Sequence, residues 1–177
     1  MKTLKDHIHE AIKIGNNLSE WSAYSCQPKT RSELKEIIKD RISKKGPNCD
    51  LNDIDVSLIT DMSGLFYVSK FTGDISGWDV SNVTKMSSMF FLSKFNGDIS
   101  KWDTSSVKNM EWMFNGSWFN DDISNWNVSK VENMFGMFAG SKFNQDISNW
   151  KINKDCNVHN MFNNCRIKDE FKPVLPK

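Results

Sequence analysis

The sequence predicts an α/β repeat solenoid, a coil of similar units that each contain one short strand and one short helix. Three observations support this class. The tripeptide Asp-Ile-Ser recurs every 24 residues, apolar residues recur in phase with it, and the apolar spacing within each unit changes from period two to i, i+3, i+4. A fixed period of roughly 20–50 residues is typical of chains whose units bury their apolar sides only against neighbouring units. We therefore expect the in-phase residues to form the core and the out-of-phase residues to form the surface.

The repeat covers residues 50–169, five units of 24 residues, with weaker copies at both ends. Asp-Ile-Ser stands at 74–76, 98–100, 122–124 and 146–148. The in-phase aromatic residues are the tryptophans Trp78, Trp102, Trp126 and Trp150 and the phenylalanines Phe66, Phe90, Phe114, Phe138, Phe162, Phe71, Phe95, Phe119 and Phe143. We expect each to stack on its counterpart one unit away, in a right-handed coil.

Each unit is expected to contain two elements. Residues 75–80 (Ile-Ser-Gly-Trp-Asp-Val) alternate between in-phase and variable positions, which predicts a short strand. In the segment 86–90, Met86, Met89 and Phe90 have the i, i+3, i+4 spacing of a short helix with one buried face. One strand and one helix in each unit is the plan of leucine-rich repeats.

The segments outside the repeat are expected to cover its ends. Residues 1–49 are predicted to be a helical N-terminal cap, and residues 170–177 a C-terminal tail. Thr30 and Glu33 fit a capping box, and Gly46-Pro47 ends the helix that this box begins. Two apolar helical stripes support the cap: Leu4, Ile8, Ala11 and Ile12, then Leu34, Ile37, Ile38 and Ile42.

Composition narrows the function. The chain has 177 residues and a net charge of +1, which argues against direct recognition of nucleic acid. No apolar run approaches the roughly 20 residues that span a bilayer, so we expect no membrane insertion. The N-terminus carries charges throughout and does not resemble an export signal, so we expect a cytoplasmic protein with four reduced cysteines. A cell-surface location, with a disulfide, is the alternative if an export signal was removed.

The polar repeats are interpreted as structural. The aspartates of Asp-Ile-Ser could form a calcium site, but acceptance of turn N–H groups explains them better. The asparagines Asn96, Asn120 and Asn144 are similarly expected to form a hydrogen-bonded ladder. The histidines do not cluster with carboxylates or cysteines at metal-ligand spacing, and no phosphate loop or nucleophile motif is present. We expect no catalytic residues, no cofactor and no metal.

Out-of-phase aromatic residues mark the predicted binding surface. They are Tyr67, Phe91, Trp112, Trp118 and Phe135. Because exposed aromatic residues are enriched at interfaces, a patch on this side would bind a protein. Two alternatives stay open. The rings could fold back as extra packing, or the partner could bind the predicted strand face, whose variable residues are Asp79, Lys101, Asp103, Asn125, Asn127 and Lys151.

The repeat motif carries a family resemblance. The pattern D-I-S-x-W-x-V-S-x-V-x-x-M-x-x-M-F-x-x-S-x-F-N resembles the BspA-like leucine-rich repeat of bacterial surface proteins and lipoproteins, and residues 29–66 resemble the helical entry that precedes such arrays. The resemblance implies attachment or protein binding without catalysis. We therefore expect a non-enzymatic protein-binding scaffold, such as an inhibitor or adaptor of a partner protein. The alternative is a bacterial surface adhesion module that lacks its export signal.

Overall fold

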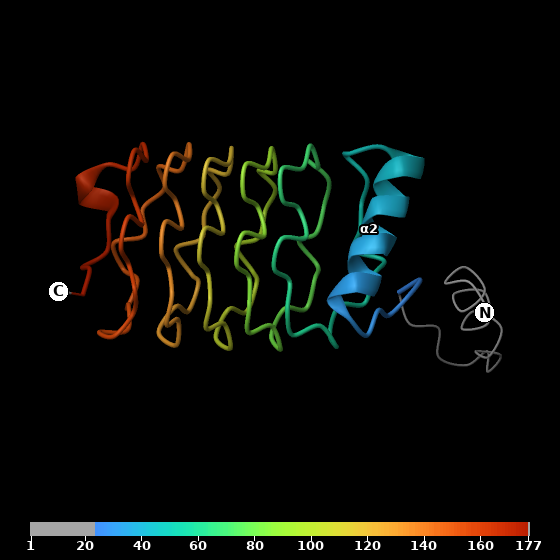
Figure 1. The fold of residues 1–177 in the computed structure, drawn as a ribbon, viewed down its shortest axis with the longest axis horizontal. Helices are drawn as coiled ribbons and strands as arrows, with labels where there is room; N and C mark the ends of the chain where they lie inside the picture. Colours follow the sequence, from blue (N-terminus) through green and yellow to red (C-terminus); the bar gives the residue numbers. More distant parts are fainter. Residues whose placement is uncertain (1–23, 177) are drawn as a thin grey trace.

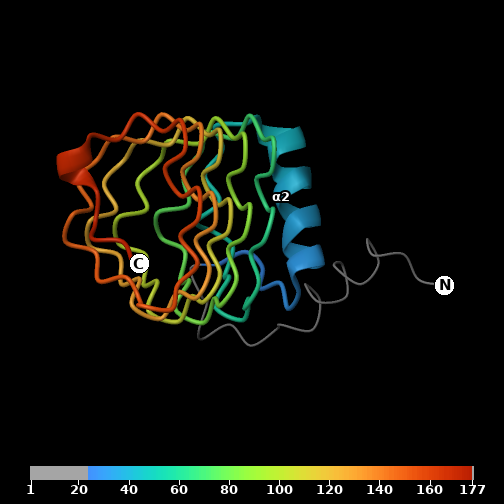
Figure 2. The ribbon, with the colours of Figure 1, turned by 60° about the vertical axis from the view of Figure 1, so that its left-hand side comes forward.

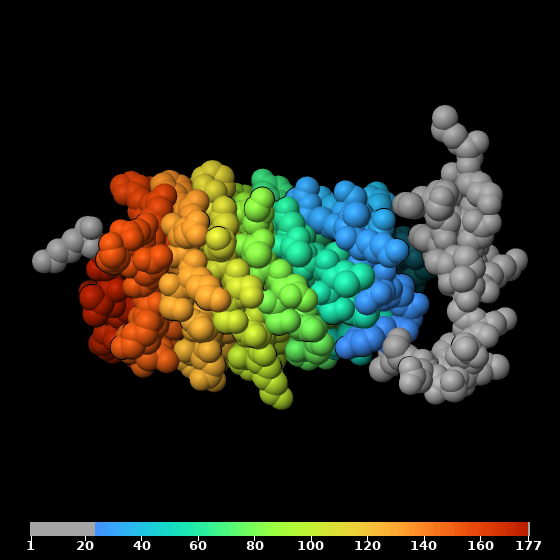
Figure 3. Space-filling view, turned by 90° about the horizontal axis from the view of Figure 1, so that it is seen from below, coloured from blue at the N-terminus to red at the C-terminus, as the bar shows by residue number. Residues whose placement is uncertain are grey.

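The computed structural model describes residues 24–176, which form a row of stacked turns of chain with a helix at one end. Figure 1 shows the turns side by side along the long axis, and Figure 2 shows the same stack obliquely. In the space-filling view the successive turns form adjoining bands across the molecule (Figure 3). The predicted helix around Leu4 and Ile12 lies outside the described residues.

The helix α2, Arg31–Lys45, covers the N-terminal end of the stack. The Thr30 side chain accepts a hydrogen bond from the Glu33 N–H, as the capping box predicts, while the Glu33 carboxylate accepts from the Lys29 N–H. Leu34 and Ile38 are buried in the core. The helix ends at Gly46, whose N–H donates to the Ile42 carbonyl.

The turns are joined by hydrogen bonds between equivalent positions. We call each 24-residue turn a coil, so coils 1 to 5 are residues 50–73, 74–97, 98–121, 122–145 and 146–169. Single-residue parallel bridges run along the stack, linking Asp61, Lys85, Asn109, Asn133 and Asn157 in order. Beside them, the N–H groups of Met62, Gly64, Phe66 and Val68 donate to carbonyls of coil 2 over 2.8–3.0 Å, and later coils repeat this pattern.

The predicted α/β solenoid with one strand and one helix per unit is wrong. In residues 24–176 the regular elements are α2 and the 3-10 helix η1, Asp169–Phe171, and the pairing between coils consists of isolated bridges without a strand. The predicted strand at 75–80 is a turn, because the Trp78 N–H donates to the Ile75 carbonyl over 3.2 Å. The leucine-rich-repeat plan of strand and helix therefore does not describe this chain.

Left-handed backbone positions explain why the predicted helices do not form. Each coil has two of them, four residues apart, and a helix cannot continue through them. The first series is Gly64, Ser88, Trp112, Gly136 and Asn160, with φ of 53–64°, and the second is Val68, Leu92, Gly116, Gly140 and Asn164, with φ of 50–66°. Consecutive turns, rather than a helix, bury Met86, Met89 and Phe90.

The in-phase residues form the core columns that the repeat predicts. Trp78, Trp102 and Trp126 stack with ring centroids 6.4 Å apart. Each of the four in-phase indoles, Trp150 included, donates its Nε1–H to a carbonyl 27 residues earlier, over 3.0–3.2 Å. Because all four indoles make the same bond, they occupy equivalent surroundings in a single column.

Two phenylalanine columns fill the rest of the core. The column Phe66, Phe90, Phe114, Phe138 and Phe162 has centroid spacings of 5.5–5.8 Å. The column Phe71, Phe95, Phe119 and Phe143 has spacings of 6.0–6.3 Å. Stacked rings at these distances attract each other in addition to the apolar area they bury, so each coil holds its neighbours in register.

The polar repeats have the structural roles expected of them. Asp74, Asp98, Asp122 and Asp146 each accept the N–H of the serine two residues later over 2.8–2.9 Å. The asparagine ladder also forms, because Asn96 accepts the Asn120 N–H and Asn120 accepts the Asn144 N–H. Cys26, Cys49, Cys156 and Cys165 are free cysteines.

Candidate protein-binding surface

Four of the five predicted surface aromatics lie in a continuous row across coils 1 to 4. The Tyr67 and Phe91 rings are stacked at 4.9 Å. The Trp112 ring is tilted against Phe91 at 6.4 Å and meets Phe135 edge-on at 5.8 Å. His159 of coil 5 extends the row, stacked on Phe135 at 5.8 Å. We call these five residues the aromatic row.

The row is exposed to solvent. Tyr67 is 54% exposed and Trp112 40%, while Phe91 and Phe135 are half-buried. In contrast, the in-phase tryptophans and phenylalanines between Trp78 and Trp150 are only 0–4% exposed. The Tyr67 and Trp112 rings therefore do not fold back into the core as extra packing.

Trp112 differs from the core tryptophans in backbone and in bonding. Its φ is 53°, a left-handed conformation that a bulky residue adopts at a cost of roughly 1–2 kcal/mol. Within the described residues its Nε1–H has no hydrogen-bond acceptor, whereas the four core indoles all have one. Its indole instead lies against Gly136 of the next coil. Trp112 thus combines a partly exposed apolar ring with a donor that has no protein acceptor in the described residues.

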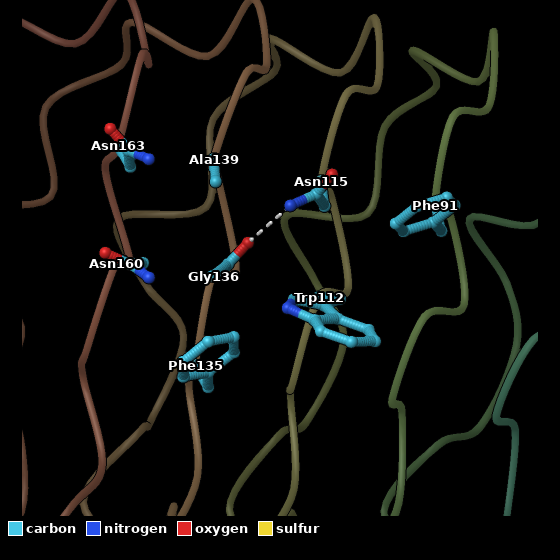
Figure 4. Close-up of a pocket in the computed structure, with 8 residues that line it drawn as sticks. All are labelled: Phe91, Trp112, Asn115, Phe135, Gly136, Ala139, Asn160 and Asn163. Carbon is cyan, nitrogen blue, oxygen red and sulfur yellow. Dashed lines mark hydrogen bonds between the residues drawn. The ribbon is translucent and has the colours of Figure 1, made fainter.

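A shallow groove of about 330 Å³ lies beside Trp112. Figure 4 shows its lining residues, which come from coils 2 to 5: Phe91, Trp112, Asn115, Phe135, Gly136, Ala139, Asn160 and Asn163. Asn115 donates its side-chain N–H to the Gly136 carbonyl over 3.3 Å. The exposed side-chain amides of Asn160 and Asn163 have no hydrogen-bond partner within the described part of the chain, so the groove combines apolar walls with polar groups.

Two aliphatic side chains extend the exposed apolar area. Val68 is 56% exposed and Leu92 50%, and both have left-handed backbones next to residues of the row. The Leu92 side chain lies over Gly116 of coil 3. Because the apolar residues are contiguous from coil 1 to coil 4, they form one patch, which is the kind of surface that marks an interaction site.

Trp118, the fifth predicted aromatic, has no ring contact with the row. It is 49% exposed and has lysines on both sides, with the Lys142 ammonium 3.5 Å and the Lys94 ammonium 5.2 Å from its ring centroid. This is a cation–π arrangement between coils 2, 3 and 4. Four of the five rings are therefore in contact with one another, while the contacts of Trp118 are to lysines.

The alternative surface is exposed but is not the face of a strand. Asp79, Lys101, Asp103, Asn125, Asn127 and Lys151 are all exposed, as predicted. Asp79 and Asp103 accept hydrogen bonds from the N–H groups of Ser81 and Ser105, so these carboxylates hold turns. None of these six residues lines the groove beside Trp112.

Residues 24–176 contain no group of three His, Cys, Asp or Glu side chains that could hold a metal ion. Burial raises the pKa of the Cys156 thiol to about 11, so this cysteine remains a thiol at neutral pH. No helix in the described chain is long and apolar enough to cross a membrane.

Sequence reasoning missed several residues of this surface. Val68, Leu92, Ala139, His159, Asn160 and Asn163 were not predicted as site residues. The signal for His159 was present, because it stands 24 residues after Phe135 in the same position of the repeat. Asn160 likewise occupies the position of Trp112 two units later.

The fold and surface define a class: a non-globular stack of 24-residue repeats with an apolar core and an exposed aromatic row. The family described as "Mycoplasma protein of unknown function, DUF285" matches residues 32–117 and 69–172, and the chain belongs to this family. The comparison with curated proteins gave no match, and neither did the comparison with solved structures.

Proposed function

We propose that this chain is a non-enzymatic scaffold that binds a partner protein through the aromatic row, such as an inhibitor or adaptor of that partner. The single observation that carries the proposal is the row itself, with Tyr67, Phe91, Trp112 and Phe135 in ring contact on the surface. Tryptophan and tyrosine contribute a large share of the binding energy at protein interfaces.

The core supports the proposal because it positions the row before any partner arrives. The backbone carbonyls of Phe91 and Phe135 accept hydrogen bonds from the preceding coils, at Val68 and Trp112. Phe90, which precedes Phe91, and Phe138, which stands three residues after Phe135, are fixed in the phenylalanine column. A surface that is ordered in advance loses less conformational entropy on binding, which favours affinity.

The resemblance of the repeat motif to BspA-like repeats supports a second form of the proposal. In that form the same surface serves adhesion at a bacterial cell surface. The two forms use the same residues and differ in the location and identity of the partner.

The test is quantitative affinity capture with matched variants. The full chain, the Trp112→Ala/Phe135→Ala variant and the Lys101→Ala/Lys151→Ala variant are immobilised and exposed to lysate and to intact cells of the source organism. We expect a protein captured by the full chain and by the lysine variant, and depleted at least about tenfold by the aromatic variant.

The same capture distinguishes the alternatives. Loss with the lysine variant and retention by the aromatic variant would assign binding to the surface around Lys101 and Lys151. Equal capture by all three proteins would contradict both surfaces. Thermal unfolding of each variant verifies that the fold persists.

A further inference from the structure

A column of cations borders the aromatic row, and we propose that the surface binds an acidic segment of a protein, with its apolar side chains on the row and its carboxylates against these cations. The column occupies one position of the repeat and consists of Lys70, Lys94, Lys142 and Arg166, with Trp118 in the coil-3 position. We call the four cations the basic column. The inference rests on the proposed function, because it names the chemistry of the partner.

The basic column and the aromatic row are close in space. Lys70 follows Tyr67 by three residues and Lys94 follows Phe91 by three, so their Cα atoms are at most about 11 Å apart. The intervening Val68 and Leu92 are exposed. The row, the aliphatic pair and the basic column are therefore close enough together for a single extended segment to contact all three.

The cations of the column are not neutralised within the described residues. Lys108, Lys154, Lys168 and Lys172 all have a carboxylate within 4 Å, in exposed ion pairs. Lys70, Lys94, Lys142 and Arg166 have none, and the contacts of Lys94 and Lys142 are to the Trp118 ring. All four are exposed.

The nearest acidic column does not cancel this charge. Asp74 and Asp98 stand four residues after Lys70 and Lys94, farther along the chain from Tyr67 and Phe91, and their carboxylates accept serine N–H groups. On the other side of the row stands Glu111, next to Trp112. Because Glu111 would repel a carboxylate, the inference places the partner's carboxylates toward Lys94 and Lys142.

The groove adds bonds that suit a peptide. The Trp112 Nε1–H is a free donor, and the free amides of Asn160 and Asn163 each offer a donor and an acceptor. A peptide backbone presents both a carbonyl and an N–H in every residue, so these groups match it. The apolar walls at Phe91, Phe135 and Ala139 take its apolar side chains.

The probe is a phage-displayed library of random dodecapeptides, selected on the immobilised full chain. Enriched peptides are synthesised, and their affinities are measured by fluorescence anisotropy at low and high salt. We expect enriched peptides to combine aspartate or glutamate with aromatic or aliphatic residues. Salt should weaken their binding, because exposed charge pairs are screened.

Matched variants assign the charge contacts to the column. Lys94→Gln/Lys142→Gln is expected to weaken the acidic peptides by roughly three- to tenfold, the range for two exposed ion pairs. The control Lys101→Gln/Lys151→Gln removes the same charge from the other exposed surface and is expected to leave affinity unchanged. Trp112→Ala is expected to abolish binding.

Each outcome separates the inference from the proposed function. Peptides that require Trp112 but lack acidic residues, or that bind the Lys94→Gln/Lys142→Gln variant as well as the control, would overturn the acidic partner and leave the protein-binding function standing. A selection that yields no peptide dependent on Trp112 would contradict both.

Discussion

The indole of Trp112 lies directly against the Cα of Gly136 in the next coil. A Cβ atom at Gly136 would stand 2.6 Å from Cδ1 and 2.7 Å from Nε1 of Trp112, and Gly136 has a left-handed φ of 59°. The Trp112 ring, on a left-handed backbone, is thus positioned by a residue that has no side chain.

Gly136→Ala is expected to destabilise the fold and displace the Trp112 ring. The left-handed backbone and the short contact together should lower the free energy of unfolding by about 1–3 kcal/mol, measured by urea denaturation. Gly140→Ala is the matched control, because its φ is 66° but its Cβ would meet nothing closer than 4.0 Å. If the two variants lose the same stability, the contact with Trp112 has no energetic role.

Val68→Asn is expected to stabilise the protein. Val68 is β-branched, has a φ of 52° and is 56% exposed, so valine is strained there and buries little. Asparagine, which occupies the equivalent position at Asn164, tolerates this conformation, and we expect a gain of about 1 kcal/mol in the free energy of unfolding. Leu58→Asn is the control: Leu58 is 49% exposed without a positive φ, and its replacement should change little. A lower free energy of unfolding for the Val68→Asn variant would show that the Val68 backbone is not strained.

Trp126→Ala is expected to lower the free energy of unfolding by about 3–5 kcal/mol, the usual range for truncation of a core aromatic. Trp126 is 3% exposed and donates to the Ile99 carbonyl over 3.0 Å. Trp118→Ala, which removes an exposed indole outside the core, should cost less than about 1 kcal/mol. Equal losses in chemical denaturation would mean that the in-phase indoles are not the core column.

Acid is expected to destabilise the stack through the Asp-Ile-Ser aspartates. Hydrogen bonds from Ser100 hold the pKa of Asp98 below its ordinary value, and those from Ser76 do the same for the pKa of Asp74. A carboxyl whose pKa is lower in the folded state stabilises the fold above its unfolded pKa, and this contribution is lost as pH falls through the folded pKa.

Stability should therefore be level near neutral pH and decline below about pH 4, in urea denaturation at a series of pH values. Asp98→Asn keeps a side-chain acceptor for the Ser100 N–H but does not titrate. This variant should lose less stability between pH 5 and pH 3 than the unmodified chain. An identical acid slope in both proteins would exclude Asp98 as a contributor.

The repeat made the core predictable, but it did not make the secondary structure predictable. In-phase residues such as Trp102 and Phe114 had to stack because every coil repeats its neighbour. The spacing of Met86, Met89 and Phe90 is shared by a helix and by consecutive turns with a left-handed residue. The glycines and asparagines at 64, 136, 160 and 164 are the local signal for the turns, since these residues adopt positive φ readily.

The site was predictable only in part. The phase of the repeat identified the out-of-phase rings, but it does not say which of them touch. Trp118 occupies a different position of the repeat from the residues of the row, and its contacts with Lys94 and Lys142 depend on three neighbouring coils. The groove also depends on several coils, because Asn160 and Asn163 reach it from coil 5.

The central claim is that the exposed aromatic row, held by a repeated core, binds a partner protein. Its most direct test is the affinity of the captured partner for the full chain and for the Trp112→Ala/Phe135→Ala variant, measured by titration calorimetry. We predict an affinity at least about tenfold weaker for the variant, with its melting temperature within a few degrees of the full chain. The same affinity for both proteins would contradict the account.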